Sequence, residues 1–374
     1  CSRDDYRIYR TQRSPTPHPY PRQGVNTRHN GFTLDGTTIA PASRTVVELP
    51  VASLYSHAPM TLPVQVVCGK YDGPRLFVSA ALHGDEINGV EIIRRLLRLP
   101  VLKKLRGTLL AIPIVNVYGF VNRSRYLPDR RDLNRSFPGS GRGSMAARLA
   151  DLFLREIVDQ SDYGIDLHTG AIHRENLPQI RANLDDEATA RIASVFHVPV
   201  LLNADLRDGS LREIAAERGI PILLYEAGEA LRFDEHAIRA GVKGVTAVMR
   251  ELKMLPATSR RRKPAEPLVA RSTYWVRAES SGILRSTATL GTRVRKGERI
   301  GVIADPFGEQ EHEVQAGYHG IIIGRTNLPL VNEGEALFHI ARFESTRVAA
   351  DMVDAFQADD LPLGPVLDEE PPIV

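Results

Sequence analysis

Residues 75–99 read RLFVSAALHGDEINGVEIIRRLLRL, and the hydrophobic pattern changes twice within this stretch. Leu76–Ala80 is an apolar run of strand length, whereas 89–99 places residues such as Ile93 and Leu96 on one helical face, with basic residues opposite. The polar turn HGDE, residues 83–86, separates the two. An apolar strand that leads through a short turn into an amphipathic helix predicts an α/β fold, in which helices cover a buried sheet.

The same alternation extends over residues 46–255. Thr108–Val115 and Ile220–Tyr225 are continuous apolar runs of strand length, and Ser144–Val158 has the period of an amphipathic helix. Continuous apolar strands are typical of sheets that are buried on both faces. We therefore predict one α/β domain over residues 46–255.

The segments outside this domain differ from it in composition. Residues 1–45 are rich in Pro, Arg, Ser and Thr and predict an extended arm. Residues 256–269 begin with PATSRRRKPAEP, whose prolines and basic run predict a linker. Residues 346–374 end in ADDLPLGPVLDEEPPIV and predict an acidic, Pro-rich tail.

Residues 270–345, between the linker and the tail, are strand-like and punctuated by glycine. They contain a weak internal repeat, because 294–300 (VRKGERI) and 331–337 (VNEGEAL) share one pattern. Two β halves of this kind resemble the sandwiched barrel of biotinyl and lipoyl carrier domains. The hairpin between the halves, 304–314, has no lysine to carry such a group, so we expect an accessory β domain.

Composition and charge exclude several classes of function. The chain has 374 residues, 43% of them hydrophobic and 25% charged, and its formal net charge of +3 gives no sign of a nucleic-acid partner. Two cysteines are too few for a disulfide scaffold and suit a reducing compartment. No apolar run reaches the roughly 18 residues that span a bilayer, and residues 1–23 lack the apolar core of a secretory signal. We expect a cytoplasmic protein with no membrane partner.

Three apolar strands end in residues that bind metal ions or move protons. The first ends at His83 and Glu86, the second, YGIDLHTG (163–170), at His168, and the third, PILLYEAGE (221–229), at Glu226. Open α/β sheets bind ligands beyond the carboxyl ends of their strands, so we expect these side chains in one crevice. Two histidines and a carboxylate hold catalytic zinc and leave a fourth position for water, while a further carboxylate acts as general base.

Each of these residues also has an ordinary structural interpretation. A His-x-x-Glu turn is most often solvated surface, and a glutamate after a buried strand is usually a helix cap or a turn residue. The combination favours a metal site, because three strands of one pattern end in this way. Asp166 shares a strand face with His168 and is expected to orient an imidazole or the metal-activated water. Gly84 is expected to allow the tight exit from the first strand.

The segment 123–140 (RSRYLPDRRDLNRSFPGS) is dense in arginine and lies between the first two ligand segments. A charge run is usually a solvated loop. The planar guanidinium group is also suited to hold a carboxylate through two hydrogen bonds or to stabilise an oxyanion. This segment is therefore a candidate for substrate recognition.

The motifs HGDE, DLNRSFPG, DLHTG and YEAGE, in this order, resemble those of the succinylglutamate desuccinylase and aspartoacylase family of the zinc carboxypeptidase superfamily. The resemblance covers about residues 46–250 and implies a zinc-carboxypeptidase-like mixed sheet flanked by helices. The β domain after the linker, with its barrel-sandwich-like pattern, also resembles the C-terminal domain of that family.

The resemblance implies a role for each residue that matches a family motif, with one zinc ion per chain. Arg181 and His173 are further candidates in the pocket, Arg181 for substrate binding. The implied roles are zinc ligand for His83, Glu86 and His168, general base for Glu226, carboxylate binding for Asn134 and Arg135, and polarisation of the scissile carbonyl for Arg125.

The reaction that these residues predict is hydrolysis of an amide bond by metal-activated water. The first interpretation is deacylation of an N-acyl amino acid or a related small carboxylate-bearing amide, and the alternative is a zinc carboxypeptidase that removes the C-terminal residue of a peptide. A third option is a non-catalytic binding protein on the same scaffold, which the complete set of ligands and the intact base disfavour. The expected partner is a small N-acyl amino acid or a short peptide, and a homo-oligomer remains open.

Overall fold

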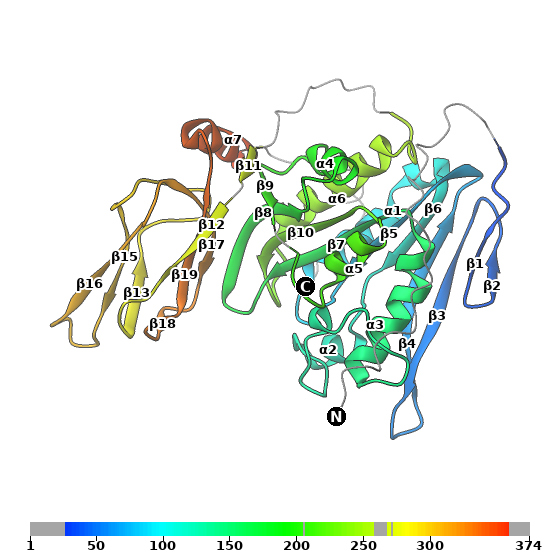
Figure 1. Cartoon of the computed structure of the whole chain (residues 1–374), viewed down its shortest axis with the longest axis horizontal. Helices are drawn as coiled ribbons and strands as arrows, with labels where there is room; N and C mark the ends of the chain where they lie inside the picture. Colours follow the sequence, from blue (N-terminus) through cyan, green and yellow to red (C-terminus); the bar gives the residue numbers. More distant parts are fainter. Residues whose placement is uncertain (1–26, 205, 258–267, 271, 359–374) are drawn as a thin grey trace, which may run out of the picture.

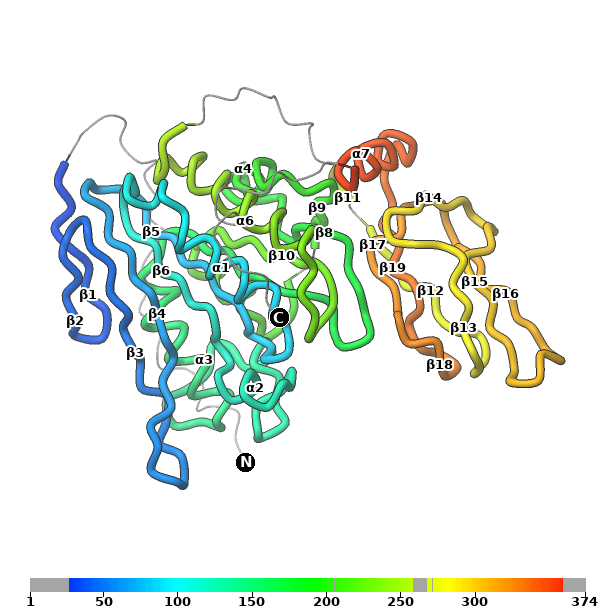
Figure 2. The backbone as a smooth tube through the Cα atoms, turned by 180° about the vertical axis from the view of Figure 1, so that it is seen from behind, coloured from blue at the N-terminus to red at the C-terminus, as the bar shows by residue number. Residues whose placement is uncertain are grey.

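The computed structural model describes residues 27–204, 206–257, 268–270 and 272–358 (Figure 1). A large mixed sheet runs through the molecule, and helices cover both faces of its N-terminal part (Figures 1 and 2). A smaller antiparallel sheet stands at the C-terminal end. The predicted α/β class, with flanking helices and a C-terminal β region, is thus confirmed. Within the described residues, no helix combines the length and the apolar character needed to cross a membrane.

Parallel strands form the part of the large sheet that carries the candidate ligands. β5 (Tyr71–Ala80) pairs in parallel with both β6 (Arg106–Ile112) and β7 (Tyr163–Gly170). β7 in turn pairs in parallel with β10 (Ile222–Glu229). The carboxyl ends of β5, β7 and β10 therefore meet at one edge of the sheet, where open α/β folds bind their ligands.

Further strands extend the sheet on both sides of this group. On one side, β4 (Pro59–Cys68) pairs antiparallel with β6, and β3 (Ser43–Ser53) pairs antiparallel with β4. On the other side, β8 (Arg174–Ala182) pairs antiparallel with β10, and the short strand β9 (Val200–Asn203) pairs in parallel with β8.

Helices pack on both faces of this sheet. α1 (Asn88–Arg98) and α6 (Glu235–Glu251) contact each other on one face, and α3 (Met145–Glu156) lies on the other. The buried side of α1 contains Ile93 and Leu96, as predicted, together with Ile92. The remaining helices before the C-terminal strands are α2 (Val117–Asn122), α4 (Glu187–Ser194) and α5 (Leu211–Glu217), with 3-10 turns at Pro100–Lys104, Leu133–Arg135 and Val158–Gln160.

The side chains of β5 divide between two hydrophobic cores. Leu76 and Val78 belong to the core under α1 and α6, whereas Phe77 points to the other face and meets Phe153 of α3 with ring centroids 6.0 Å apart. Burial on both faces explains why the strand is apolar at successive positions. Each fully buried side chain of this size contributes about 1.5–3 kcal/mol relative to an exposed one.

The C-terminal lobe, residues 272–345, shares the large sheet. β17 (Gly320–Thr326) pairs antiparallel with β8, with Gly324 opposite Asn176. β19 (Ala336–Arg342) and then β12 (Ser272–Arg277) continue the sheet beyond β17. Backbone hydrogen bonds therefore join the lobe to the α/β part of the molecule. Its other strands are β13 (Gly282–Ser286), β14 (Arg293–Val294), β15 (Arg299–Ala304), β16 (Glu311–Gln315) and β18 (Leu330–Val331).

The predicted N-terminal arm contains a hairpin. Residues 1–26 of the arm lie outside the described residues, but β1 (Phe32–Leu34) pairs antiparallel with β2 (Thr37–Ile39). Phe32 and Leu34 of β1 and Ile39 of β2 are buried in the hydrophobic core between the sheet and α3. Three apolar residues in a polar segment are too few to produce a detectable period, although they are enough to anchor a hairpin.

The predicted linker and tail also contain regular structure. β11 (Leu268–Ala270) pairs in parallel with β9, and α7 (Thr346–Ala358) buries Ala349 and Val353 against Ile321 of β17. The prediction of a tail is therefore wrong for residues 346–358, which form a helix. Its two buried apolar residues are four positions apart, so they lie on the same side of the helix and pack together against the sheet. Residues 258–267 and 359–374 lie outside the described residues.

Candidate active site

The turn after β5 places the first two candidate ligands at the carboxyl edge of the sheet. Ala81 has a φ of +50°, a left-handed conformation that costs most residues energy, so the chain leaves the strand sharply there. A Cβ on Gly84 would lie 2.0 Å from the backbone of Gly119 in α2. The chain thus turns sharply out of β5 at Ala81 and not at Gly84, where the sequence analysis expected the turn. A glycine is required at position 84 for a different reason, because the backbone of α2 packs directly against it.

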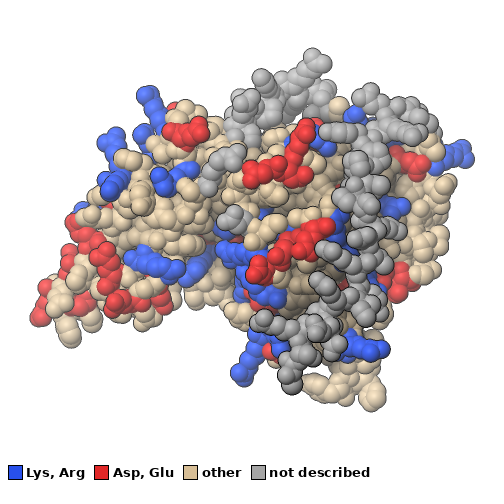
Figure 3. Space-filling model, in the orientation of Figure 1, with Lys and Arg blue, Asp and Glu red and all other residues tan. Residues whose placement is uncertain are grey.

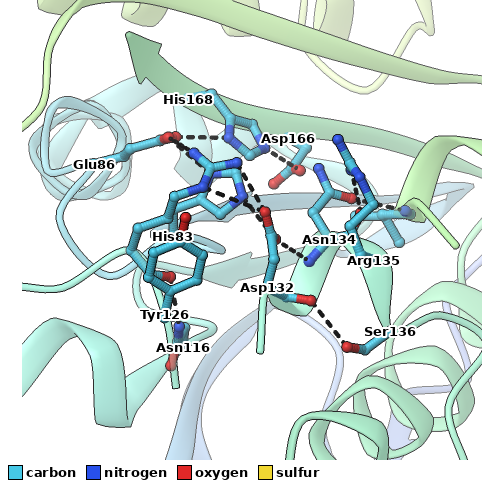
Figure 4. A network of polar contacts seen from close by, with 12 residues as sticks. His83, Glu86, Asn116, Tyr126, Asp132, Asn134, Arg135, Ser136, Asp166 and His168 are labelled. Carbon is cyan, nitrogen blue, oxygen red and sulfur yellow. Dashed lines mark hydrogen bonds and ion pairs between the residues drawn. The ribbon is translucent and has the colours of Figure 1, made fainter. Parts of the chain in front are cut away.

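Three candidate ligands converge beyond β5 and β7 (Figure 4). Oε1 of Glu86 lies 2.7 Å from Nδ1 of His83, and Oε2 of Glu86 lies 2.7 Å from Nδ1 of His168. One ligand atom from each residue lies within 4.8 Å of the other two, and all three side chains are buried. Both imidazoles thus direct Nδ1 to the carboxylate of Glu86, an arrangement that suits a metal site with three protein ligands.

Charge interactions favour a cation at this position. Burial raises the pKa of the Glu86 carboxyl, but the neighbouring His83 and His168 imidazoles outweigh burial and lower it. Burial lowers the pKa of both imidazoles, and their carboxylate neighbours more than reverse this effect. A buried carboxylate that stays ionised between two ring nitrogens is a donor set in which a divalent cation replaces the bound protons.

Carboxylates hold the outer nitrogens of both imidazoles (Figure 4). Nε2 of His168 lies 2.6 Å from Oδ2 of Asp166, whose Oδ1 accepts a hydrogen bond of 2.7 Å from Ser79. Nε2 of His83 lies 3.2 Å from Oδ1 of Asp132. A carboxylate on the outer nitrogen fixes the tautomer and the orientation of an imidazole that binds metal through the other one. Asp166 therefore lies where the sequence predicts, whereas Asp132 was not among the predicted site residues.

We expect Asp132→Asn to weaken metal binding about ten- to hundredfold, because the amide orients the His83 ring less strongly than a carboxylate does. Competition between the protein and a chelator of known affinity measures this change. Asp151→Asn is the matched control, since Asp151 lies on α3 and accepts a hydrogen bond from Arg155 away from the site. Equal metal affinity in the Asp132 variant and the control would contradict this role.

Arg125 lies beside the candidate ligands. Its NH1 is 3.3 Å from Oε1 of Glu86, and its NH2 is 3.0 Å from Oδ2 of Asp132. Burial lowers the pKa of the Arg125 guanidinium, but the charges of Glu86 and Asp132 together raise it. Asn116 fixes the backbone here, because its Nδ2 donates to the carbonyl oxygen of Arg125. A cation is thus held next to the position where a substrate carbonyl would meet the candidate metal site.

Glu226 stands next to His168 in the sheet. The two residues are paired in the parallel register of β10 and β7, so their side chains point to the same face. Oε2 of Glu226 lies 2.5 Å from Nε of Arg181 on β8. The contact is an ion pair without hydrogen-bond alignment, since neither atom has a hydrogen-bond partner within the described residues. A carboxylate and a guanidinium therefore flank the candidate metal site on the β10 side.

Asn134 and Arg135 line the same cavity, and His173 does not. Oδ1 of Asn134 accepts a hydrogen bond of 3.0 Å from the backbone N–H of Leu211, which fixes the amide plane. His173 is exposed, and its Nδ1 lies 4.0 Å from Glu229. The structure thus brings together every predicted site residue except this last candidate.

The cavity has a volume of about 580 Å³ and extends from the candidate ligands to the C-terminal lobe. Within the described part of the chain, seven arginines and two glutamates line it. Burial lowers the pKa of Arg212 to about 10, and Arg181 adds to this effect. Sequence analysis missed several of these lining residues, because they come from segments without a recognisable motif: Arg174, Arg207, Arg212, Trp275, Arg277 and His339.

Comparisons with known proteins find one matching family model and a curated relative. The model of the succinylglutamate desuccinylase/aspartoacylase catalytic domain matches residues 72–252. The N-alpha-acetyl-L-2,4-diaminobutyric acid deacetylase of Halomonas elongata is 27% identical over 317 residues, which are 79% of this chain and 90% of that protein.

Two solved structures have a similar fold. A succinylglutamate desuccinylase/aspartoacylase of Rhodobacter sphaeroides superposes with a TM-score of 0.71 at 24% identity, over 80% of this chain and 96% of the other. The product-bound ectoine utilization protein EutE (DoeB) of Ruegeria pomeroyi also gives a TM-score of 0.71 at 24% identity, over 80% and 94% of the two chains.

Proposed function

Because the chain belongs to the succinylglutamate desuccinylase/aspartoacylase family, we propose that it is a zinc-dependent amidohydrolase that deacylates an N-acyl amino acid or a related small carboxylate-bearing amide. The observation that carries this proposal is the convergence of His83, Glu86 and His168 beside Glu226 at one sheet edge. The Halomonas elongata relative is a deacetylase and the matching family model is named for a desuccinylase and an acylase, which supports an amide as the substrate.

The residues at the site fit one zinc ion per chain. Two imidazole nitrogens and one carboxylate are the ligands of many catalytic zinc sites, and each imidazole has a carboxylate on its outer nitrogen. In this proposal His83, Glu86 and His168 hold the ion. Zinc bound there supplies Lewis-acid chemistry, which makes a water molecule nucleophilic near neutral pH.

The side chains around the ligands divide the remaining tasks. Asn134 and Arg135 hold the carboxylate of the substrate, and this fixes the amide in the cavity. Arg125 donates hydrogen bonds to the oxygen of the scissile carbonyl as negative charge develops on it. Glu226 takes a proton from the attacking water and gives it to the nitrogen of the leaving amine, with Arg181 orienting its carboxylate. The products are a carboxylic acid and a free amino acid.

Zinc-loaded protein is expected to release free amine from N-acetyl and N-succinyl amino acids. An assay for primary amines measures this release, and the same protein after chelator treatment is the control. Faster release from dipeptides than from N-acyl amino acids would favour a carboxypeptidase instead. Binding without any turnover would support the non-catalytic alternative and contradict the proposal.

A further inference from the structure

Acidic and basic side chains are interspersed on the face of the molecule shown in Figure 3, so charge does not single out a further binding surface on that face. A buried polar side chain outside the cavity, Asn88, is more informative. It is 1% exposed and is the first residue of α1, directly after the turn that carries two candidate ligands. Asparagine near a helix start usually caps that helix. Here Ile87 holds the cap position without a side-chain hydrogen bond, and the amide of Asn88 points elsewhere.

Both ends of the Asn88 amide bind the segment that follows Glu226. Its Nδ2 donates a hydrogen bond of 3.2 Å to the backbone oxygen of Ala227, and its Oδ1 accepts one of 3.0 Å from the backbone N–H of Asp234. Asp234 in turn caps α6, because its side chain accepts a hydrogen bond from the N–H of Ala237. The amide therefore joins the residue next to the candidate general base to the start of α6.

Strand β10 is irregular at the point where Asn88 binds it. Its parallel register with β7 runs in step up to Glu226, opposite His168, and shifts before Glu229. Its antiparallel register with β8 shifts between Glu226 and Gly228. A bulge of this kind interrupts the ladder of backbone hydrogen bonds and redirects the neighbouring side chains. The direction of the Glu226 carboxylate therefore depends on the contacts that hold the bulge.

Gly228 lies in this bulge, directly against the amide of Asn88. Its φ is +74°, a left-handed conformation that favours glycine. A Cβ at this position would lie 2.6 Å from Nδ2 of Asn88 and 3.2 Å from Cβ of Asp234. A side chain there would push the amide away from the Ala227 oxygen. The absence of a side chain at Gly228 thus allows Asn88 to reach the backbone beside Glu226.

A backbone hydrogen bond joins the same two segments. The N–H of Leu231 donates to the backbone oxygen of Asp85 at 2.8 Å. Asp85 and Asn88 stand on either side of Glu86 in the sequence, so the turn is bound to the end of β10 on both sides of this candidate ligand. These contacts set the position of the Glu226 backbone relative to the turn.

We propose that Asn88 is a positioning residue, which holds the bulge after Glu226 and so directs this carboxylate to the water that it deprotonates. The inference rests on the proposed function, in which Glu226 is the general base. Proton transfer requires the two heavy atoms to be within about 3.2 Å of each other. A shift of the bulge by about 1 Å therefore slows hydrolysis, although the candidate metal ligands and the carboxylate-binding pair Asn134 and Arg135 stay in place.

Asn88→Ala is expected to lower kcat for amide hydrolysis by about ten- to hundredfold, the scale of a misplaced catalytic group. KM and zinc content should stay close to those of the parent. Asn88→Asp should lose as much activity, because its carboxylate still accepts from the Asp234 N–H but cannot donate to the Ala227 oxygen at neutral pH. Amine release from N-acetyl and N-succinyl amino acids by full-length, zinc-loaded protein measures both parameters.

Asn203→Ala is the matched control for these variants. Oδ1 of Asn203 also accepts from a backbone N–H, that of Leu184 at 2.9 Å, and its Nδ2 donates to Asp185. Asn203 does not line the cavity, and it ends β9 rather than contacting β10. Its removal should leave kcat, KM and zinc content close to those of the parent.

A double-variant cycle separates positioning from a general effect on the fold. If Asn88 acts through Glu226, Asn88→Ala should cause little further loss in a protein that already carries Glu226→Gln. Single-turnover rates measure the slow hydrolysis of the double variant. An equal loss in both backgrounds, full activity of both Asn88 variants, or loss of zinc or of folding in both would overturn the proposal. Failure of the deacylase function would appear separately, as absence of amine release by the parent.

Discussion

Glu226→Gln is expected to lower kcat for amide hydrolysis by about two to four orders of magnitude, the usual contribution of a general base. The glutamine keeps the size of the side chain but cannot accept the proton of the attacking water. Metal content should not change, because Glu226 is not among the three residues whose ligand atoms converge. Amine release measured together with zinc analysis of the same sample tests both statements.

Glu229→Gln is the matched control for this prediction. Glu229 ends the same strand, but its carboxylate accepts hydrogen bonds from the backbone of His173 and the side chain of Asn327, and it does not line the cavity. Its kcat should stay close to that of the parent protein. Full activity in the Glu226 variant, or an equal loss of activity in both variants, would contradict the role of Glu226 as general base.

His168→Ala is expected to abolish both zinc retention and turnover. His168 is one of the three candidate ligands, and its removal also leaves the buried carboxylates of Glu86 and Asp166 without their shared imidazole. After dialysis, the parent should hold about one zinc per chain, as a three-ligand catalytic site does, and the variant should hold very little. Zinc should raise the melting temperature of the parent alone, because binding to the folded state stabilises it.

His173→Ala separates this effect from the loss of any nearby histidine. His173 lies five positions further along the chain, is exposed, and takes no part in the cluster. Zinc content and turnover of this control should match the parent. If the His168 variant kept its zinc, the proposed ligand set would be wrong even if activity were lost.

Features that lie within one strand–turn–helix unit were predictable from the sequence. The run Leu76–Ala80 is apolar because both of its faces are buried, and His83 and Glu86 follow it at the edge where ligands bind. His168 and Glu226 repeat the same pattern on neighbouring parallel strands. Strand ends in a parallel sheet must meet at one edge, and for this reason short motifs far apart in the chain could be combined into one site.

Features that depend on contacts between distant segments were not predictable. Asp132 lies 49 positions after His83 in the sequence, and its motif does not indicate that its carboxylate contacts the His83 ring. Trp275 and Arg277 look like ordinary strand residues until β17 pairs with β8 and brings the lobe to the cavity. The hairpin at 32–39 and the helix from residue 346 each depend on two or three apolar residues, which a polar sequence around them conceals.

The cavity does not lie between two domains that could hinge apart, because the strands on both of its sides belong to one shared sheet. To move the lobe away, the protein would have to break the β17–β8 ladder and open the core where α7 meets Ile321 and Ile323. The walls at Glu226 and Trp275 are therefore held at a fixed separation before any ligand arrives. Binding of a ligand in this cavity is therefore expected to cost little in ordering the protein, because the walls are fixed before the ligand arrives.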